Sequence, residues 1–212
     1  MILRDEMGII CQHDIYNNHA LDEGDSCNRT ALLSLFGSTF DTCLLHHFHI
    51  GSGTLVRHPK PKKIPNDLRE HDDPRGFSRD QLIPYVAALS KSEHYPKTLK
   101  SIFAKRMGRC FLEQNFDVLF SPVTLAFLIK ACRIYWFYFF LPIGYLFLIL
   151  DIVWFTKIKP YDEQNQFISV LEIMGMKSMY KKLHPDWKKA TMNYWDSWRD
   201  QKEIGEKIIE NF

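Results

Sequence analysis

The residues best suited to chemistry lie in one short acidic segment, LDEGDSCNRT. Asp22 and Asp25 stand on either side of Gly24, and Arg29 follows them. Two carboxylates in different environments can act as general acid and general base, and Gly24 lets the backbone turn so that both point to one place. The alternative is structural, because Asp25 suits a helix cap and Asp22 a turn. Arg29 falls in the first helical turn, where the dipole disfavours a cation, which indicates pairing with Asp22 or Asp25.

A second polar group follows in the segment GTLVRHP and the loop after it. Arg57 and His58 precede Pro59, and Asp73 lies further along the same loop. A histidine beside an arginine and near carboxylates can act as a general base or bind an anionic group. The alternative is a solvated basic loop that ends in RHPKPKK.

A third group is found in FSRDQL. Ser78 and Gln81 have the spacing of a capping box, which explains both residues by helix initiation. Arg79 and Asp80 are not explained in this way, so they are the residues of this segment that we assign to a site.

The three groups together define one predicted site with two kinds of residue. The candidates for catalysis are Asp22, Asp25, His58 and Asp80, and the candidates for ligand binding are Arg29, Arg57, Asp73 and Arg79. The sequence contains no HExxH, no GxSxG, no glycine-rich phosphate loop and no zinc ribbon. No metal ligand and no cofactor are therefore assigned.

Composition limits the kinds of partner. The 27 basic and 25 acidic residues give a net charge of +2, so no nucleic-acid partner is expected. The five cysteines include no CxxC pair, which favours free thiols in a reducing compartment. Charged residues at Arg4, Asp5 and Glu6 interrupt the start of the chain, where a signal peptide needs an apolar run.

Hydrophobic periodicity predicts a mainly α fold of about seven helices with almost no sheet. A long polar loop at 50–77 carries many prolines, glycines and charges, with one short strand at 54–57. The predicted helices are 27–48, a helix that begins at 78, 96–116, 122–140, 142–157, a helix after 160, and a helical region at 185–212.

Residues 122–157 hold most of the strongest hydrophobicity of the chain. From Ile134 to Phe155 the only charge is Asp151, and the run is long enough to cross a bilayer. Pro142, however, divides it, and the second helix, at about 16 residues, is short for a span. We expect an apolar central hairpin of a partial α/α toroid. A membrane span through 122–157 is the alternative, because membrane helices tolerate proline kinks and because Tyr135, Trp136 and Trp154 suit the two membrane interfaces.

The expected organisation is one helical domain at 1–184, with a polar N-terminal segment, and a charged tail at 185–212. Trp187, Trp195 and Trp198 lie in this tail. Their large apolar rings can dock on the body of the protein or on a protein partner.

Four segments carry a resemblance to a known group of proteins: ICQHD, LDEGDSCNRT, LVRHP and FSRDQLIPYVAAL. This set resembles uncharacterised proteins of tailed phages and related bacterial elements, which share an acidic GD[ST]xxR segment and an FSRDQ segment. The resemblance covers residues 1–90 well and the apolar helices loosely. It implies a phage context, in the host cytoplasm or the virion, and no established activity.

A helical body with acidic and arginine-bearing loops at its helix N-termini is also the layout of helical toroids that act on polysaccharides. We therefore expect a phage-type helical protein whose polar site binds or cleaves a carbohydrate-like ligand, and leave open whether it is an enzyme. The alternative is a non-enzymatic virion structural protein or a membrane-associated interaction protein. In that case the same residues form caps and salt bridges.

Overall fold

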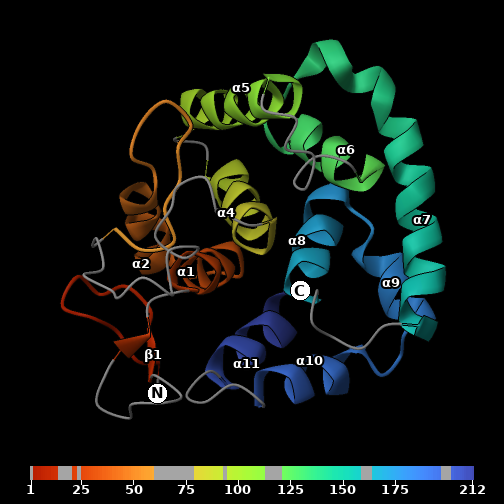
Figure 1. Cartoon of the computed structure of the whole chain (residues 1–212). Helices are drawn as coiled ribbons and strands as arrows, with labels where there is room; N and C mark the ends of the chain where they lie inside the picture. The colour runs from red at the N-terminus through yellow and green to blue at the C-terminus, as the bar shows by residue number, and fades with distance from the viewer. Residues whose placement is uncertain are drawn as a thin grey trace.

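The computed structural model describes residues 2–13, 21–22, 25–59, 79–92, 95–112, 121–158, 164–196 and 202–212. The fold is mainly α, as predicted (Figure 1). Two very short strands, β1 (Gln12–His13) and β2 (Leu21–Asp22), form an antiparallel pair. The helices in the described ranges are α1 (Ser26–Leu35), α2 (Thr39–Leu44), η1 (Leu45–Phe48), α4 (Arg79–Lys91), α5 (Pro96–Leu112), α6 (Pro122–Ala131), η4 (Tyr135–Phe140), α7 (Leu141–Ile158), α8 (Gln164–Met174), α9 (Lys177–Leu183), α10 (Trp187–Asp196) and α11 (Lys202–Asn211).

Several predicted helices are divided by residues with a positive φ. Gly37, at φ +114°, separates α1 from α2 inside the range predicted as one helix. Arg133, at φ +55°, follows α6, and Gly175, at φ +76°, separates α8 from α9. A left-handed residue ends a helix while the chain stays close to the core. The hydrophobic period therefore continues across the turn, and periodicity alone does not show the break.

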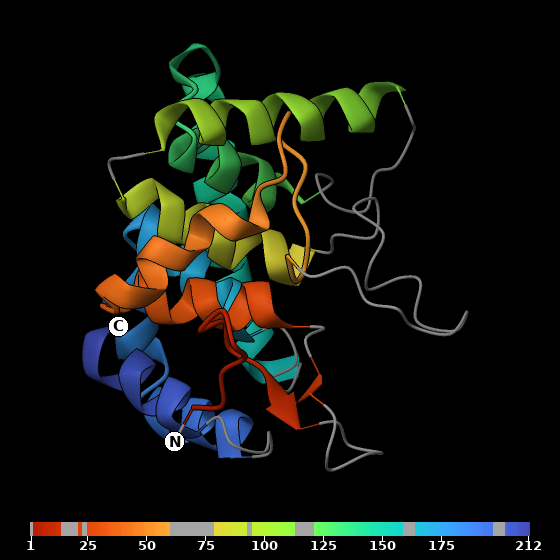
Figure 2. The same ribbon diagram turned by 90° about the vertical axis from the view of Figure 1, so that its left-hand side faces the viewer.

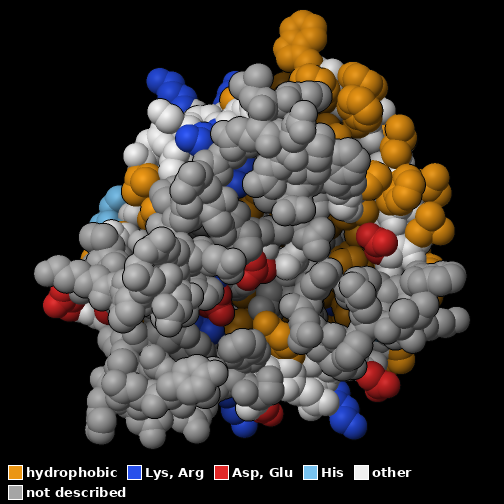
Figure 3. All heavy atoms as spheres, in the orientation of Figure 1, with side chains coloured by type: hydrophobic (Ala, Val, Ile, Leu, Met, Phe, Trp, Pro, Cys, Tyr) orange, Lys and Arg blue, Asp and Glu red, His pale blue; other side chains and the backbone are white. Residues whose placement is uncertain are grey.

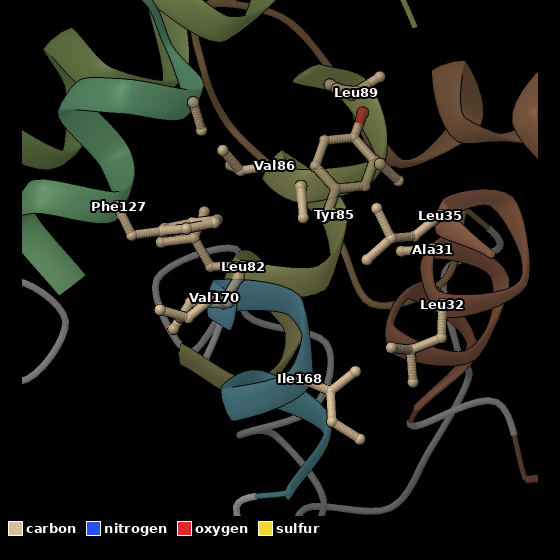
Figure 4. Packing of buried hydrophobic residues seen from close by; sticks show 14 of the residues in the cluster. Ala31, Leu32, Leu35, Leu82, Tyr85, Val86, Leu89, Phe127, Ile168 and Val170 are labelled. Atoms are coloured by element: carbon tan, nitrogen blue, oxygen red, sulfur yellow. The ribbon is translucent and has the colours of Figure 1, made fainter. Parts of the chain in front are cut away.

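The core is built around α4, which lies in the middle of the molecule (Figure 1), and its packing is seen from close by in Figure 4. The side chains of residues 81–89 are all buried. They pack against α1 on one side and against α6 and α8 on the other. The labelled residues of this packing are Ala31, Leu32, Leu35, Leu82, Tyr85, Val86, Leu89, Phe127, Ile168 and Val170.

The other helices surround α4 and α8. α5 lies at one end of the molecule, and α10 and α11 lie at the opposite end (Figures 1 and 2). The predicted 122–157 hairpin forms as α6 and α7, but the two helices have different surroundings. α6 is mostly buried, whereas α7 lies at the edge with Ile143, Leu146 and Leu150 exposed. The centre expected for this hairpin is occupied by α4 and α8 instead.

The C-terminal helices pack on the body of the same chain. Trp187 and Trp195 are buried, and Phe212 sits with its ring centroid 6.1 Å from that of Phe36. A Cβ on Gly205 would lie 2.9 Å from Trp195, so α11 requires glycine to approach α10 this closely. The 185–212 region thus belongs to the same hydrophobic core as the rest of the chain.

Two other expectations concern strands and membranes. The predicted strand at 54–57 appears as a single bridge between His49 and Leu55, and the predicted loop from residue 60 to 77 lies outside the described residues. In the described part, one helical stretch, Tyr135–Val153, is long and apolar enough to cross a membrane, with a mean hydropathy of 2.0. Only 17% of this stretch is buried in the protein.

Candidate acidic and arginine site

The carboxylate of Asp25 lies at the centre of a polar group, which we call the Asp25 cluster: Asp25, Arg29, Arg57, Asp80 and Gln81. Asp25 Oδ1 accepts a hydrogen bond of 2.9 Å from Gln81 Nε2 and lies 3.4 Å from Arg57 Nη1. Asp25 Oδ2 lies 3.3 Å from Arg29 Nη2. The donors come from three separate parts of the chain, namely α1, the segment before Pro59, and α4.

Asp25 occupies the N-cap position of α1 without capping it through its side chain. Its carboxylate points to the donors of the Asp25 cluster instead. The pairing predicted for Arg29 is therefore confirmed with Asp25, one helical turn away.

The cluster has a buried side and an accessible side. The side chain of Asp25 is 32% exposed, whereas those of Arg29 and Arg57 are 4% and 12% exposed. Gln81 is fully buried. The donors are thus more deeply buried than the Asp25 carboxylate, which a ligand can reach.

Gln81 joins the first turns of two helices. Its Oε1 accepts the backbone N–H of Asn28 at 2.9 Å, and the Asn28 side chain donates to the backbone oxygen of Asp80 at 2.8 Å. In a regular α-helix, the N–H of residue 84 would donate to this backbone oxygen of Asp80. Pro84, inside α4, has no N–H. The proline therefore frees an Asp80 acceptor that Asn28 uses, and this fixes α1 against α4.

A second carboxylate, that of Asp80, contacts the same Gln81 amide group. Asp80 Oδ2 is 3.5 Å from Gln81 Nε2, the nitrogen that also donates to Asp25. Asp80 is half-buried in the first turn of α4, where a carboxylate interacts favourably with the helix dipole. Two carboxylates therefore flank one donor, with Asp25 partly open to solvent.

Cys27 lies next to this group but does not supply a nucleophile. Burial raises the pKa of its thiol well above 9.0, an effect that the nearby Arg57 opposes and Asp80 reinforces. The thiol is thus protonated at neutral pH, and thiolate chemistry requires the deprotonated form. Its backbone N–H donates to the Arg57 oxygen at 3.0 Å, which positions Arg57 beside α1.

His58 pairs with the N-terminal segment of the chain. Its Nε2 lies 3.3 Å from Asp5 Oδ2, and both side chains are almost fully buried. The other oxygen of Asp5 accepts the backbone N–H groups of Met7 and Ile9 at 2.8 and 2.9 Å. This pair fixes the N-terminal segment beside Arg57, so His58 adjoins the Asp25 cluster through its neighbour in sequence.

Asp5, Cys11 and His58 could together hold a metal ion. Their ligand atoms all lie within 4.8 Å of one another. Carboxylate, thiolate and imidazole are ligand types that zinc accepts. The Cys11 thiol now donates to the backbone oxygen of Ile9 at 3.5 Å. The sequence did not indicate this group, because His58 lies far from Asp5 and Cys11 along the chain.

The structure brings together four of the eight predicted site residues: Asp25, Arg29, Arg57 and Asp80. His58 adjoins them. Asp22 lies on β2 and Arg79 begins α4, but for these two residues the description covers only the backbone, and Asp73 lies outside the described residues.

Sequence reasoning missed Gln81 and Asn28, which position the carboxylates. Gln81 was explained by the capping box, and its amide in fact contacts Asp25 and Asn28. Pro84 in the middle of a helical pattern was the signal that a nearby backbone oxygen needs another donor.

Comparisons of the chain with models of known families, with curated proteins and with solved structures give no match.

Proposed function

We propose that the Asp25 cluster binds a carbohydrate-like ligand and that Asp25 and Asp80 are the groups that act on it. The observation that supports this most strongly is the accessible Asp25 carboxylate held by buried donors from three parts of the chain. Sugars offer hydroxyl groups that both donate and accept hydrogen bonds. A group of carboxylates and guanidinium and amide donors matches that pattern.

A purely structural role explains the cluster less well. Removing charged groups from water costs several kcal/mol each, and well-packed apolar residues of similar size often give equal or greater stability. The charges of Arg29 and Arg57 are therefore weak stabilising elements by themselves. Their value in a ligand site is greater, because they orient an exposed carboxylate before the ligand arrives.

The paired carboxylates also suit cleavage of a glycosidic bond. Such hydrolysis uses one carboxyl group as the acid and a second as the base or nucleophile. Arg29, Arg57 and Gln81 all donate to Asp25, so we assign it as the base or nucleophile. Asp80, on the other side of the Gln81 amide, is then the second carboxyl group of the reaction. The resemblance of the first 90 residues to phage-encoded proteins favours a bacterial surface polysaccharide as the substrate class.

The experiment is co-sedimentation of the purified protein with insoluble polysaccharides, namely chitin, cellulose and bacterial peptidoglycan, together with an assay for newly formed reducing ends. We expect one of these to retain the protein, and Asp80→Asn to lose reducing-end formation while it stays folded. Equal reducing-end formation by the wild type and Asp80→Asn would contradict the proposed catalytic role of Asp80. Equal co-sedimentation of the wild type and Asp25→Asn with the polysaccharide would contradict the proposed ligand binding by Asp25.

A further inference from the structure

A large apolar surface lies on η4 and α7. We call it the aromatic face. Figure 3 shows hydrophobic side chains gathered along the edge of the molecule where η4 and α7 lie. Trp136 is 90% exposed. The other exposed large side chains of this face are Tyr135, Phe137, Phe139, Ile143, Leu146, Phe147, Leu150 and Val153.

The opposite side of α7 is fixed to the body of the protein. Leu148 and Ile152 are fully buried there, and Gly144 lies so close to Ala126 of α6 that a Cβ at this position would collide with it. Tyr145 donates to the backbone oxygen of Met174 at 2.9 Å. The helix therefore has two apolar sides, and the fold uses only one of them.

An apolar surface with this many large exposed side chains is expected to be shielded from water by a binding partner. The largest apolar patch on an ordinary soluble monomer is about 300–600 Å² and is often functional. Burial of apolar surface contributes a free energy of about 25 cal/mol per Å², and this stabilisation is lost where the surface stays in water. Nine large side chains in one stretch make a surface with a strong tendency to leave water.

The chemistry around the aromatic face fits a lipid surface. Tyr135 and Trp136 stand at one end of the run, and these two residue types favour the boundary between lipid and water. Basic side chains lie beside that end: Lys100 and Arg133 line a pocket together with Tyr135, and both are exposed. Lysine and arginine next to an apolar surface attract anionic lipid headgroups.

We propose that the aromatic face is a membrane-binding surface that lies in the interfacial plane of a bilayer containing anionic lipids. The helix lies on the membrane and does not cross it. Crossing would require α7 to give up the buried contacts of Leu148 and Ile152 and its close approach to α6. This surface is separate from the Asp25 cluster, so the proposal does not depend on the function proposed above.

The test is flotation of the full-length protein with vesicles of phosphatidylcholine alone or mixed with phosphatidylglycerol. We expect the wild type to float with the mixed vesicles, to float less at high salt, and to be released by a carbonate wash. A triple variant, Trp136→Glu with Leu146→Glu and Leu150→Glu, is expected to lower partitioning by about 100-fold, because it removes apolar contact and adds charge of the wrong sign.

The matched control changes exposed apolar residues elsewhere. Phe40, on α2, and Ile50, just after η1, are 55% and 58% exposed, and α2 lies on the opposite side of the molecule from α7 (Figure 1). The double variant Phe40→Glu with Ile50→Glu is expected to float as the wild type does. Circular dichroism verifies that both variants fold, which is expected because all five side chains face solvent.

Three results would overturn the proposal. If the wild-type protein floats with neither kind of vesicle, the aromatic face does not bind lipid. A dimer in light scattering would then identify a second copy of the chain as the partner of this face. Equal flotation of the triple variant and the control places the contact elsewhere. Resistance to the carbonate wash shows that the stretch crosses the bilayer.

Discussion

The amide nitrogen of Gln81 lies 2.9 Å from Oδ1 of Asp25, and this contact between residues 56 apart in sequence joins α4 to the start of α1. The oxygen of the same amide accepts the backbone N–H of Asn28. Position 81 therefore requires one donor and one acceptor in a fully buried place, and a carboxamide supplies both.

Gln81→Glu is expected to lower the free energy of unfolding by about 2–4 kcal/mol. The change replaces the donor with a carboxylate that faces both Asp25 and Asp80. The measurement is urea denaturation at neutral pH.

A second substitution gives a direct control for this contact. In the double variant Asp25→Asn with Gln81→Glu, the donor and the acceptor are exchanged between the two positions. We expect part of the lost stability to return, with a coupling energy of about 1–2 kcal/mol in a double-mutant cycle. Additive effects of the two substitutions would show that the 2.9 Å contact does not hold α4 against α1.

Gly144→Ala is expected to destabilise the α6–α7 packing by about 1–3 kcal/mol, because the new methyl group collides with Ala126. This result is opposite to the helix propensity of alanine, which favours the substitution by about 1 kcal/mol. Thermal or urea denaturation measures the change.

Gly108 is the matched control for this helical glycine. A Cβ there meets nothing within 4 Å, so Gly108→Ala is expected to leave stability unchanged or raise it. The exchange of Ala126→Gly with Gly144→Ala should recover part of the loss. Equal behaviour of Gly144→Ala and Gly108→Ala would contradict the close approach of the two helices.

The cysteines are expected to differ in reactivity. Cys43 is exposed, whereas Cys11, Cys27 and Cys132 are buried. Burial raises the pKa of Cys132 to about 12, so its thiolate is scarce in the folded protein. Brief treatment with iodoacetamide under native conditions should modify Cys43 and spare these three, as read from peptide masses. Modification of Cys27 at a rate close to that of Cys43 would refute its buried position.

The raised pKa of Cys132 also gives a dependence of stability on alkaline pH. The unfolded thiol loses its proton near pH 9.0, while the folded thiol keeps it up to about pH 12. The folded state therefore binds more protons in this window, and the free energy of unfolding falls as pH rises through it. Cys132→Ala should reduce this slope, measured as the urea midpoint against pH. An unchanged slope would show that other groups cause it.

Glu172 gives the opposite dependence, at acid pH. Burial alone would raise the pKa of its carboxyl, but the hydrogen bonds from Lys91 and Lys177, at 2.6 and 3.0 Å, outweigh burial and lower it below 4.5. The stabilisation is therefore present above pH 4.5 and is lost as pH falls below that value.

Glu172→Gln is expected to lower stability at neutral pH by about 0.5–1 kcal/mol, because both lysines are partly exposed and solvent screens the pair. It should also flatten the acid side of the curve of melting temperature against pH. A curve parallel to that of the wild type at every pH would contradict the role of the lysine contacts.

The helices were predictable from the sequence because apolar periodicity is a local property. Their exact ends were not, since Arg133 takes a left-handed conformation that its residue type rarely adopts. The position of α7 was not predictable for a different reason. Its apolar residues surround the helix, and composition does not reveal that α6 covers only one side of them.

The site shows the same distinction between local and distant contacts. Asp25 and Arg29 are one helical turn apart, so their pairing followed from spacing. The pairs Asp25 with Gln81 and Asp5 with His58 depend on the tertiary fold, which spacing in one sequence does not contain.

We propose that Asp25 and Asp80 form a site for a carbohydrate-like ligand. The most direct measurement is the dissociation constant for the polysaccharide that retains the protein, compared between the wild type, Asp25→Asn with Asp80→Asn, and the exposed control Asp186→Asn. We expect a loss of about 100-fold or more for the double variant and none for the control, with all three proteins folded. Equal constants for the three proteins, or no polysaccharide bound by the wild type, would contradict it.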